Sequence, residues 1–442
     1  MNIQLSDHFT FKRLIQFVIP SIMMMIFTSI YGVVDGFFVS NFVGKTPFAA
    51  VNLIMPVPMM LGSLGFMLGT GGTALVSMTL EEGKIELANK IFSFLIYVGV
   101  ITGCVLAAVG IFIMEPVAIL LGAEGEMISM CVIYANILLL SLPAFMLQNM
   151  FQSFLIASEK PNLGLFITLI AGVTNMILDA LFMAVFDWGI VGAATATAIS
   201  QCIGGIIPLI YFIRKNNSPL QLTKTKFDGS VLFKACTNGS SELVSNISMS
   251  FVSMLYNLQL MRFAGENGVA AYGVIMYVNF IFISIFLGYS VGTAPIIGYN
   301  HGSGNHAELK NIFKKSITFI ASAGIVLTLT ALILSSPLSK IFVGYDAALY
   351  KMTIHAFKIY ALSFLFCGFG IFASSLFTAL NNGAISAAIS FLRTIIFQTA
   401  AILIMPEIWD LNGIWYSVAT AEILATIVSI ICIVKYKKKY HY

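Results

Sequence analysis

The chain of 442 residues is 59% hydrophobic, and Asp, Glu, Lys and Arg together make up only 10% of it. Soluble globular proteins contain about 25% charged residues and fewer apolar ones, so these proportions exclude an ordinary soluble protein. The mean hydropathy of +0.94 indicates a polytopic membrane protein, and the formal net charge is only +4. Since a spanning helix needs about 20 apolar residues, the chain has room for about twelve spans and no sizeable soluble domain.

Apolar runs recur along the whole chain and are separated by short polar connectors. Each run is long enough to cross a bilayer as a helix and therefore predicts a span. The longest connector follows the sixth run and divides the chain into a predicted N-lobe (1–213), a cytoplasmic linker (214–235) and a C-lobe (236–442). The predicted spans are 14–42, 51–79, 91–113, 127–157, 164–186, 189–213, 236–263, 269–299, 315–336, 352–379, 384–405 and 413–434.

The positive residues are concentrated in alternate connectors. Of the 23 Lys and Arg residues, 17 lie near the two termini or in even-numbered connectors. Positive side chains accumulate in the cytoplasmic loops of membrane proteins, so these connectors are expected to face the cytoplasm. The sequence therefore predicts a multi-pass protein of the cell membrane, with an even number of spans and both termini in the cytoplasm.

The two halves of the chain resemble each other. Gly72-Thr73-Ala74 recurs as Gly292-Thr293-Ala294, and Gly189-Ile190 recurs as Gly413-Ile414, each at a distance of about 220 residues. An even number of spans separates the copies, so both have the same orientation in the membrane. Many transporters are built from such repeats and carry substrate along the interface between them. We therefore predict an all-α polytopic membrane protein with twelve helices in two pseudo-symmetric six-helix lobes.

Few ionisable residues fall inside the spans, and each is a functional candidate because charge is costly to place in a bilayer. Asp35 and Asp179 each lie seven residues before the outer end of their predicted span, span one and span five respectively. At 1.5 Å per residue, both are expected about 10–11 Å below the outer surface. Asn175 lies one helical turn before Asp179, and Thr197 of span six reaches the same depth.

These four residues predict a binding site for a coupling cation. Their oxygen atoms suit a hard monovalent cation such as Na⁺. A proton is an equal alternative, because burial and a neighbouring carboxylate both favour the neutral form of a carboxyl group. Pro20 in span one removes a helical hydrogen bond and is predicted to be a bending point. Polar residues in spans also serve only to join helices, but the shared depth of these four favours a site.

Other polar residues in the spans are open to more than one interpretation. Tyr31, one turn before Asp35, and Asn149 of span four either extend the polar network or are interior residues with satisfied hydrogen bonds. Glu242, near the inner end of span seven, is either solvated or helps to bind a cationic substrate. Arg393 in span eleven either reaches the membrane surface, pairs with an acid or meets an anionic head group.

The chain resembles the multidrug and toxic compound extrusion (MATE) family over essentially its whole length. The resemblance is carried by Pro20, by Asp35 within the segment 34–40, by Gly44 with Ala49-Ala50-Val51, by Asn175 with Asp179, and by Gly239-Ser240-Ser241-Glu242. It is to the DinF-type branch, and the segment 239–242 is similar to its MepA-type members. The resemblance implies a V-shaped pair of lobes that exports cationic or amphipathic drugs and toxic compounds by alternating access, driven by entry of H⁺ or Na⁺.

The resemblance also implies roles for individual residues. In the DinF-type branch the coupling ion is assigned to N-lobe positions that match Asp35, Asn175, Asp179 and Thr197. Further family positions that line the same lobe match Tyr31, Tyr134 and Asn149. The other main branch uses C-lobe acids in spans seven and ten, which this sequence lacks at those places. Glu242 is then a candidate substrate contact only.

Two other functions fit the sequence less well than drug export. A flippase for lipid-linked sugars, from the same wider superfamily, moves anionic pyrophosphates and is expected to line its cavity with several Lys or Arg, but Arg393 is the only intramembrane cation expected here. An enzyme needs a catalytic motif, and neither HExxH nor a Gly-rich phosphate loop occurs. We therefore expect no enzymatic activity and no cofactor, and a monomer whose partners are small-molecule drugs or toxins and the lipid bilayer, not nucleic acid.

Overall fold

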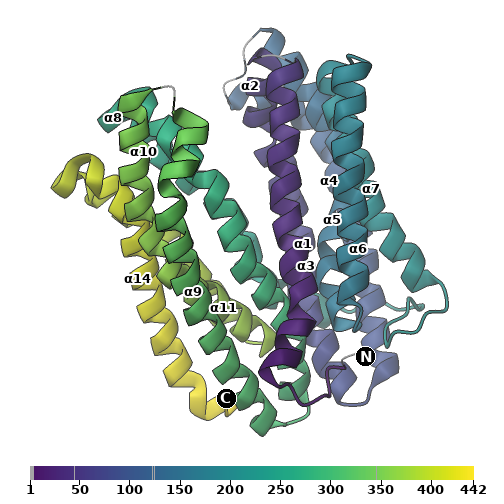
Figure 1. The fold of residues 1–442 in the computed structure, drawn as a ribbon. Helices are drawn as coiled ribbons and strands as arrows, with labels where there is room; N and C mark the ends of the chain where they lie inside the picture. The colour runs from purple at the N-terminus through teal and green to yellow at the C-terminus, as the bar shows by residue number, and fades with distance from the viewer. Residues whose placement is uncertain (1–3, 44, 122, 124, 345) are drawn as a thin grey trace.

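The computed structural model contains two bundles of helices that meet at one end and diverge toward the other, as Figure 1 shows. It describes residues 4–43, 45–121, 123, 125–344 and 346–442, so Gly44 of the motif above lies outside the described residues. Every element within the described residues is a helix. The predicted all-α fold is therefore confirmed.

The N-lobe holds the first seven α-helices and two π-helical segments. The segment η1 continues α1, and η2 continues α6 directly after Asp179. The elements are α1 (Phe11–Phe38), η1 (Val39–Val43), α2 (Lys45–Ile54), α3 (Pro56–Glu81), α4 (Ile85–Leu120), α5 (Glu126–Ala157), α6 (Pro161–Asp179), η2 (Ala180–Val185) and α7 (Gly189–Ile213).

The C-lobe begins with the longest helix of the chain. The elements are α8 (Gly229–Gly302), α9 (His306–Val343), α10 (Ala347–Tyr360), η3 (Ala361–Ser363), α11 (Phe364–Ala379), α12 (Gly383–Phe391), η4 (Leu392–Phe397), α13 (Gln398–Ile404) and α14 (Pro406–Tyr440). Within α8 the helical path breaks at Gly265, where φ is 58°. A positive φ suits glycine, so this residue separates the predicted spans seven and eight.

Eleven helices among the described residues are long and apolar enough to cross a membrane. The remaining predicted span, 236–263, is the first half of α8. It is helical as predicted, but its sequence is interrupted by polar residues such as Asn238, Ser241 and Glu242. The polytopic membrane architecture is thus confirmed.

One predicted span is divided in the structure. The range 51–79 was expected to be a single helix, but α2 ends at Ile54 and α3 begins at Pro56. Proline has no amide hydrogen and its ring clashes with the carbonyl group four residues earlier, so the helix is interrupted there. In contrast, α1 continues through Pro20 without interruption.

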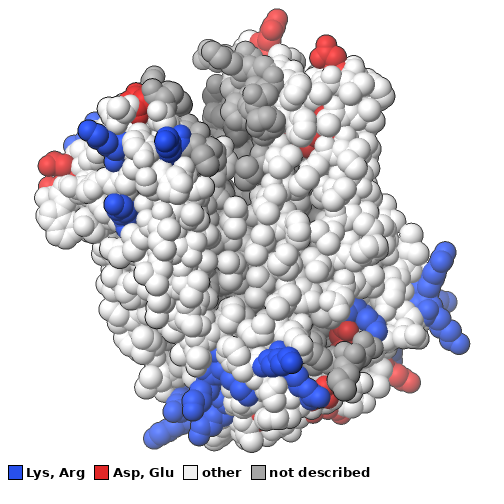
Figure 2. Space-filling view, in the orientation of Figure 1, with Lys and Arg blue, Asp and Glu red and all other residues white. Residues whose placement is uncertain are grey.

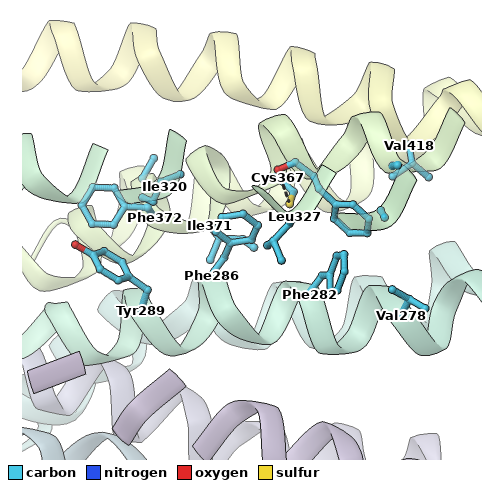
Figure 3. Close-up of a cluster of buried hydrophobic side chains, with 14 of the residues drawn as sticks. Val278, Phe282, Phe286, Tyr289, Ile320, Leu327, Cys367, Ile371, Phe372 and Val418 are labelled. Carbon is cyan, nitrogen blue, oxygen red and sulfur yellow. Dashed lines mark hydrogen bonds between the residues drawn. The ribbon is translucent and has the colours of Figure 1, made fainter. Parts of the chain in front are cut away.

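Two apolar cores are present, one mainly in each lobe. In the C-lobe, Val278, Phe282 and Phe286 of α8 face Leu327 of α9 and Ile371 of α11, as Figure 3 shows. In the N-lobe, the rings of Phe92, Phe151, Phe154 and Phe212 pack together, with the Phe92 and Phe212 centroids 4.9 Å apart. The C-lobe core also includes Leu14, Phe17 and Val18 of α1, so this helix packs against both lobes.

The lobes meet most closely at the end that carries both chain termini. There α3 of the N-lobe packs against α8 of the C-lobe. A β-carbon at Gly71 would overlap the carbonyl oxygen of Ala235, and one at Gly239 would overlap that of Met67. Glycine is therefore required at both positions for this backbone contact. Figure 2 shows that most of the Lys and Arg side chains visible on this face lie at the same end, and that a smaller group lies at the opposite end of the C-lobe.

A short N-terminal segment, residues 4–9, joins the two lobes at this end. The Leu5 amide donates a hydrogen bond to Glu159 Oε1 beyond α5, at 2.9 Å. The Phe9 amide donates to Glu308 Oε1 of α9 at 2.9 Å, and Asn311 Nδ2 donates to the Phe9 carbonyl at 3.0 Å. Leu5 and Phe9 are buried. The segment is thus anchored to both lobes by main-chain hydrogen bonds.

We expect Glu308→Ala to loosen the contact between the lobes at this end. The change leaves the buried Phe9 amide without its acceptor, which costs about 1–3 kcal/mol. Spin labels at positions 86 and 310, both exposed at this end, should report a longer or broader distance distribution in the variant than in the otherwise unchanged protein.

The control for this measurement is Glu82→Ala, which removes an exposed ion pair with Lys84 at the same end. It should leave the distance distribution unchanged. Identical distributions in Glu308→Ala and its parent would show that residues 4–9 do not hold the lobes together.

Candidate functional site

Helices α1, α5 and α6 of the N-lobe bring Asp35, Tyr134 and Asp179 together. Asp35 lies near the end of α1, and Asp179 is the last residue of α6. The side chains of Asp35 and Asp179 are adjacent, and the Tyr134 hydroxyl of α5 lies close to both. Asp35 is 6% exposed, and Asp179 and Tyr134 are fully buried.

The fourth helix, α7, is held against α6 at the same level. The Ser200 hydroxyl of α7 donates to the Ala171 carbonyl of α6 at 2.8 Å. The two helices run in opposite directions. Thr197 lies about one turn from Ser200 and Asn175 about one turn from Ala171, both toward the same end of the lobe. Thr197 and Asn175 therefore lie at one level of the α6–α7 pair.

Several polar atoms of this group are buried without a hydrogen-bond partner among the described residues. This is unusual, because buried polar groups in proteins are nearly always paired. The atoms are Asp35 Oδ1, Asn175 Nδ2, Asp179 Oδ1 and Oδ2, Thr197 Oγ1 and Tyr134 Oη. We call the side chains of Asp35, Tyr134, Asn175, Asp179 and Thr197 the N-lobe polar cluster. A flip of the Asn175 amide exchanges its oxygen and nitrogen, so either atom can face the cluster.

The N-lobe polar cluster is suited to a monovalent cation or a proton. No group of three or more His, Cys, Asp or Glu side chains among the described residues is placed to hold a metal ion. The cluster instead combines two carboxylates with hydroxyl and amide groups, which are oxygen ligands for a hard cation. Two adjacent buried carboxylates also repel each other unless a positive charge or a proton lies between them.

The backbone near Asp179 is irregular. The π-helical segment η2 begins at Ala180, and the Phe186 amide donates to the Leu181 carbonyl, five residues earlier, at 2.9 Å. Short π-helical segments inside α-helices are rare and are often found at functional sites. The Asp179 carboxylate is thus carried at the junction of two helix types.

Tyr31 and Asn149 have different surroundings. Tyr31 lies beside Asp35 and Gln148, and its ring packs against Gly172 of α6. Asn149 Nδ2 donates to the Gly62 carbonyl of α3 at 3.0 Å, so this side chain joins α5 to α3. Asn149 is therefore an interior residue with a satisfied hydrogen bond, which is one of the two interpretations above.

Gln148 is a neighbour of the site that the sequence analysis missed. It lies next to Tyr31 and is 6% exposed. Its side chain packs directly against Gly204 of α7, which leaves no room there for a β-carbon. The signal available in the sequence was a group of three amide side chains, Gln148, Asn149 and Gln152, within five residues of one span.

The charged residues of the C-lobe spans form a second group. Arg393 lies in η4 and donates three hydrogen bonds to Glu422 of α14, from Nε at 3.1 and 2.9 Å and from Nη2 at 2.9 Å. Of the alternatives for Arg393, pairing with an acid is therefore the one observed. Glu242 of α8 lies near Arg393.

The two kinds of polar residue in the N-lobe should respond differently to substitution. Asp179→Asn removes one of two adjacent buried carboxylates, so we expect the unfolding temperature in detergent to stay unchanged or rise. Asn149→Ala leaves the Gly62 carbonyl unpaired and should lower the free energy of unfolding by about 1–3 kcal/mol. Thermal unfolding of the purified variants at low salt measures both. An equal fall in both variants would contradict the assignment of Asp179 to an unpaired, functional cluster.

Comparisons with known proteins identify the family. The family model MatE matches residues 20–181 and 243–402, one segment in each lobe, which start about 220 residues apart. Multidrug export protein MepA of Staphylococcus saprophyticus is 27% identical over 96% of this chain and 93% of its own, and MepA of Staphylococcus aureus strain MRSA252 is 25% identical over the same shares. The solved outward-facing structure of a multidrug resistance MATE family transporter of the MOP superfamily has a TM-score of 0.92 at 22% identity, covering 99% of both chains. Since the family model covers most of the chain, this multi-pass membrane protein belongs to the MatE family.

Proposed function

We propose that the protein exports cationic or amphipathic organic compounds from the cell in exchange for an entering monovalent cation, H⁺ or Na⁺. The single observation that carries the coupling is the N-lobe polar cluster, where two adjacent carboxylates are buried and only partly hydrogen-bonded. Lone polar residues that merely join helices would be paired with a neighbouring helix, as Asn149 is. The names of the MepA relatives support drugs as the exported class.

The charge distribution supports an orientation in the membrane. Most of the Lys and Arg side chains visible in Figure 2 lie at the end that carries both termini (Figure 1), which the positive-inside rule places in the cytoplasm. The lobes diverge toward the opposite end. In this orientation the protein faces outward, and the close contact of α3 with α8 closes the cytoplasmic side.

The cluster suggests how an entering cation drives the transport cycle. A cation or proton arriving from outside would relieve the repulsion between Asp35 and Asp179 and draw α1 and α6 together. The helix α1 also packs against α8 of the C-lobe, so a change in α1 would reach the interface between the lobes. Release of the cation to the cytoplasm would then follow the change to the inward-facing state, and the two states alternate.

A flippase for lipid-linked sugars is a weaker alternative. Its anionic substrates require several free cations in the cavity. Among the described residues, Arg393 is the only Lys or Arg that lines the large cavity described below, and its three hydrogen bonds go to Glu422.

We predict that Asp35→Asn and Asp179→Asn each reduce ethidium efflux from cells at least tenfold, because either change removes a charge that binds the coupling cation. The matched control is Asp187→Asn, an exposed aspartate of the same lobe, which should retain normal efflux. Normal efflux in both cluster variants at normal expression would refute the coupling role.

The coupling ion is identified by imposing an inward Na⁺ gradient and an inward pH gradient separately on proteoliposomes. At least one of the two should drive ethidium transport in the unmodified protein, and the same gradient should fail with Asp35→Asn/Asp179→Asn. If neither gradient alters transport in the unmodified protein, cation exchange is excluded.

A further inference from the structure

A large cavity in the C-lobe is the feature that the N-lobe polar cluster does not explain. Its volume is about 750 Å³, within the range of ligand-binding cavities. Its wall comes from both halves of α8, from α11, from the region of η4 and from α14, and Cys367, Ile371 and Val418 of the apolar core in Figure 3 contribute to it. Met249, Met276 and Phe280 add flexible and aromatic surface.

The charges in this cavity are unbalanced. The charged residues that line it are Glu242, Arg393 and Glu422, all within the described part of the chain. Arg393 and Glu422 are joined by three hydrogen bonds. With two acids and one base ionised, the lining has a formal net charge of −1. The Glu242 side chain makes no hydrogen bond to any described residue, and Arg393, which lies near it, donates its hydrogen bonds to Glu422.

Glu242 also lies where the cavity meets the closed side of the protein. It borders a second, small space of about 30 Å³, which is lined by Thr70 and Thr73 of α3 and Ser290 of α8. This space lies between the lobes. A ligand held by Glu242 would therefore lie next to the interface between the lobes, which must open when the protein changes to the inward-facing state.

One residue in the wall of the cavity belongs to the other lobe. Ser29 of α1 lines the cavity, and its hydroxyl lies 2.5 Å from the Ser284 hydroxyl of α8. Below this point α1 stays close to α8, since a β-carbon at Gly288 would lie 2.5 Å from the Ile22 α-carbon. Asp35 of the N-lobe polar cluster is six residues beyond Ser29 on α1, about 9 Å along the helix.

We propose that the C-lobe cavity binds one large organic monocation with Glu242 as its counter-ion, and that α1 forms a movable wall of this site through Ser29. The proposal rests on the proposed export function and adds the binding site, its charge preference and its link to the coupling site. Its size and its Met and aromatic surface suit varied apolar groups around the positive charge. Movement of α1 at Asp35 would alter the cavity wall at Ser29.

The first test measures equilibrium binding to the purified protein, with no ion gradient. The probes are radiolabelled tetraphenylphosphonium and tetraphenylborate, which have nearly the same shape and opposite charge. We expect the protein to bind the phosphonium at least tenfold more tightly than the borate, and Glu242→Gln to weaken phosphonium binding at least tenfold. The control Glu407→Gln removes an exposed C-lobe acid and should bind normally.

Unchanged phosphonium binding by Glu242→Gln, or equal binding of the two probes, would overturn the proposal. A general loss of structure in Glu242→Gln is recognised by its thermal unfolding, and Glu242→Asp, which keeps the charge, should then recover binding in part. Because binding is measured without transport, normal efflux by the Asp35 and Asp179 variants would refute the coupling role and leave this result unaffected.

The second test concerns α1. Ser29→Cys/Ser284→Cys in a background without the six native cysteines places two thiols where the two hydroxyls meet. Oxidation after phosphonium has bound should slow its dissociation at least tenfold, and reduction should restore the rate. An unchanged dissociation rate in protein with a confirmed disulfide would show that α1 is not a wall that moves.

Discussion

The absence of water inside a bilayer is the constraint on which the rest of this structure depends. Each buried polar group must find a partner within the protein or lose free energy. Most do here, as the Asn149 contact with Gly62 and the Arg393–Glu422 pair show. Buried polar atoms without a partner also occur elsewhere among the described residues, but the N-lobe polar cluster gathers six of them, three on its two carboxylates. We propose that a transported ion or proton satisfies these atoms.

The helix α1 links the features of the two lobes. Its upper part carries Asp35 into the N-lobe beside α6, while Ser29 and the residues below it lie against α8 of the C-lobe. One helix therefore touches the proposed cation site and the wall of the proposed drug site. The segment 4–9 that precedes it is anchored to both lobes. This arrangement gives a physical route by which one site influences the other.

Much of this architecture could be predicted from the sequence, because the bilayer imposes simple rules on length and charge. The rise per residue placed Asp35 and Asp179 at one depth, and their side chains adjoin in the structure. The break at Pro56 was missed because apolar runs on both sides masked it. The partner of Arg393 and the cavity beside Glu242 depend on how distant spans pack, and single-sequence patterns contain no such information. Gln148 was passed over because one glutamine carries no charge.

The central claim is that a cation held by Asp35 and Asp179 is exchanged against drug. The most direct measurement is the release of H⁺ or Na⁺ when tetraphenylphosphonium binds to the purified protein, recorded with a pH indicator in weak buffer and with radioactive sodium. Cation release in the unmodified protein, and phosphonium binding without release in Asp35→Asn/Asp179→Asn, is the result that the account predicts. Equal release from both proteins would contradict it.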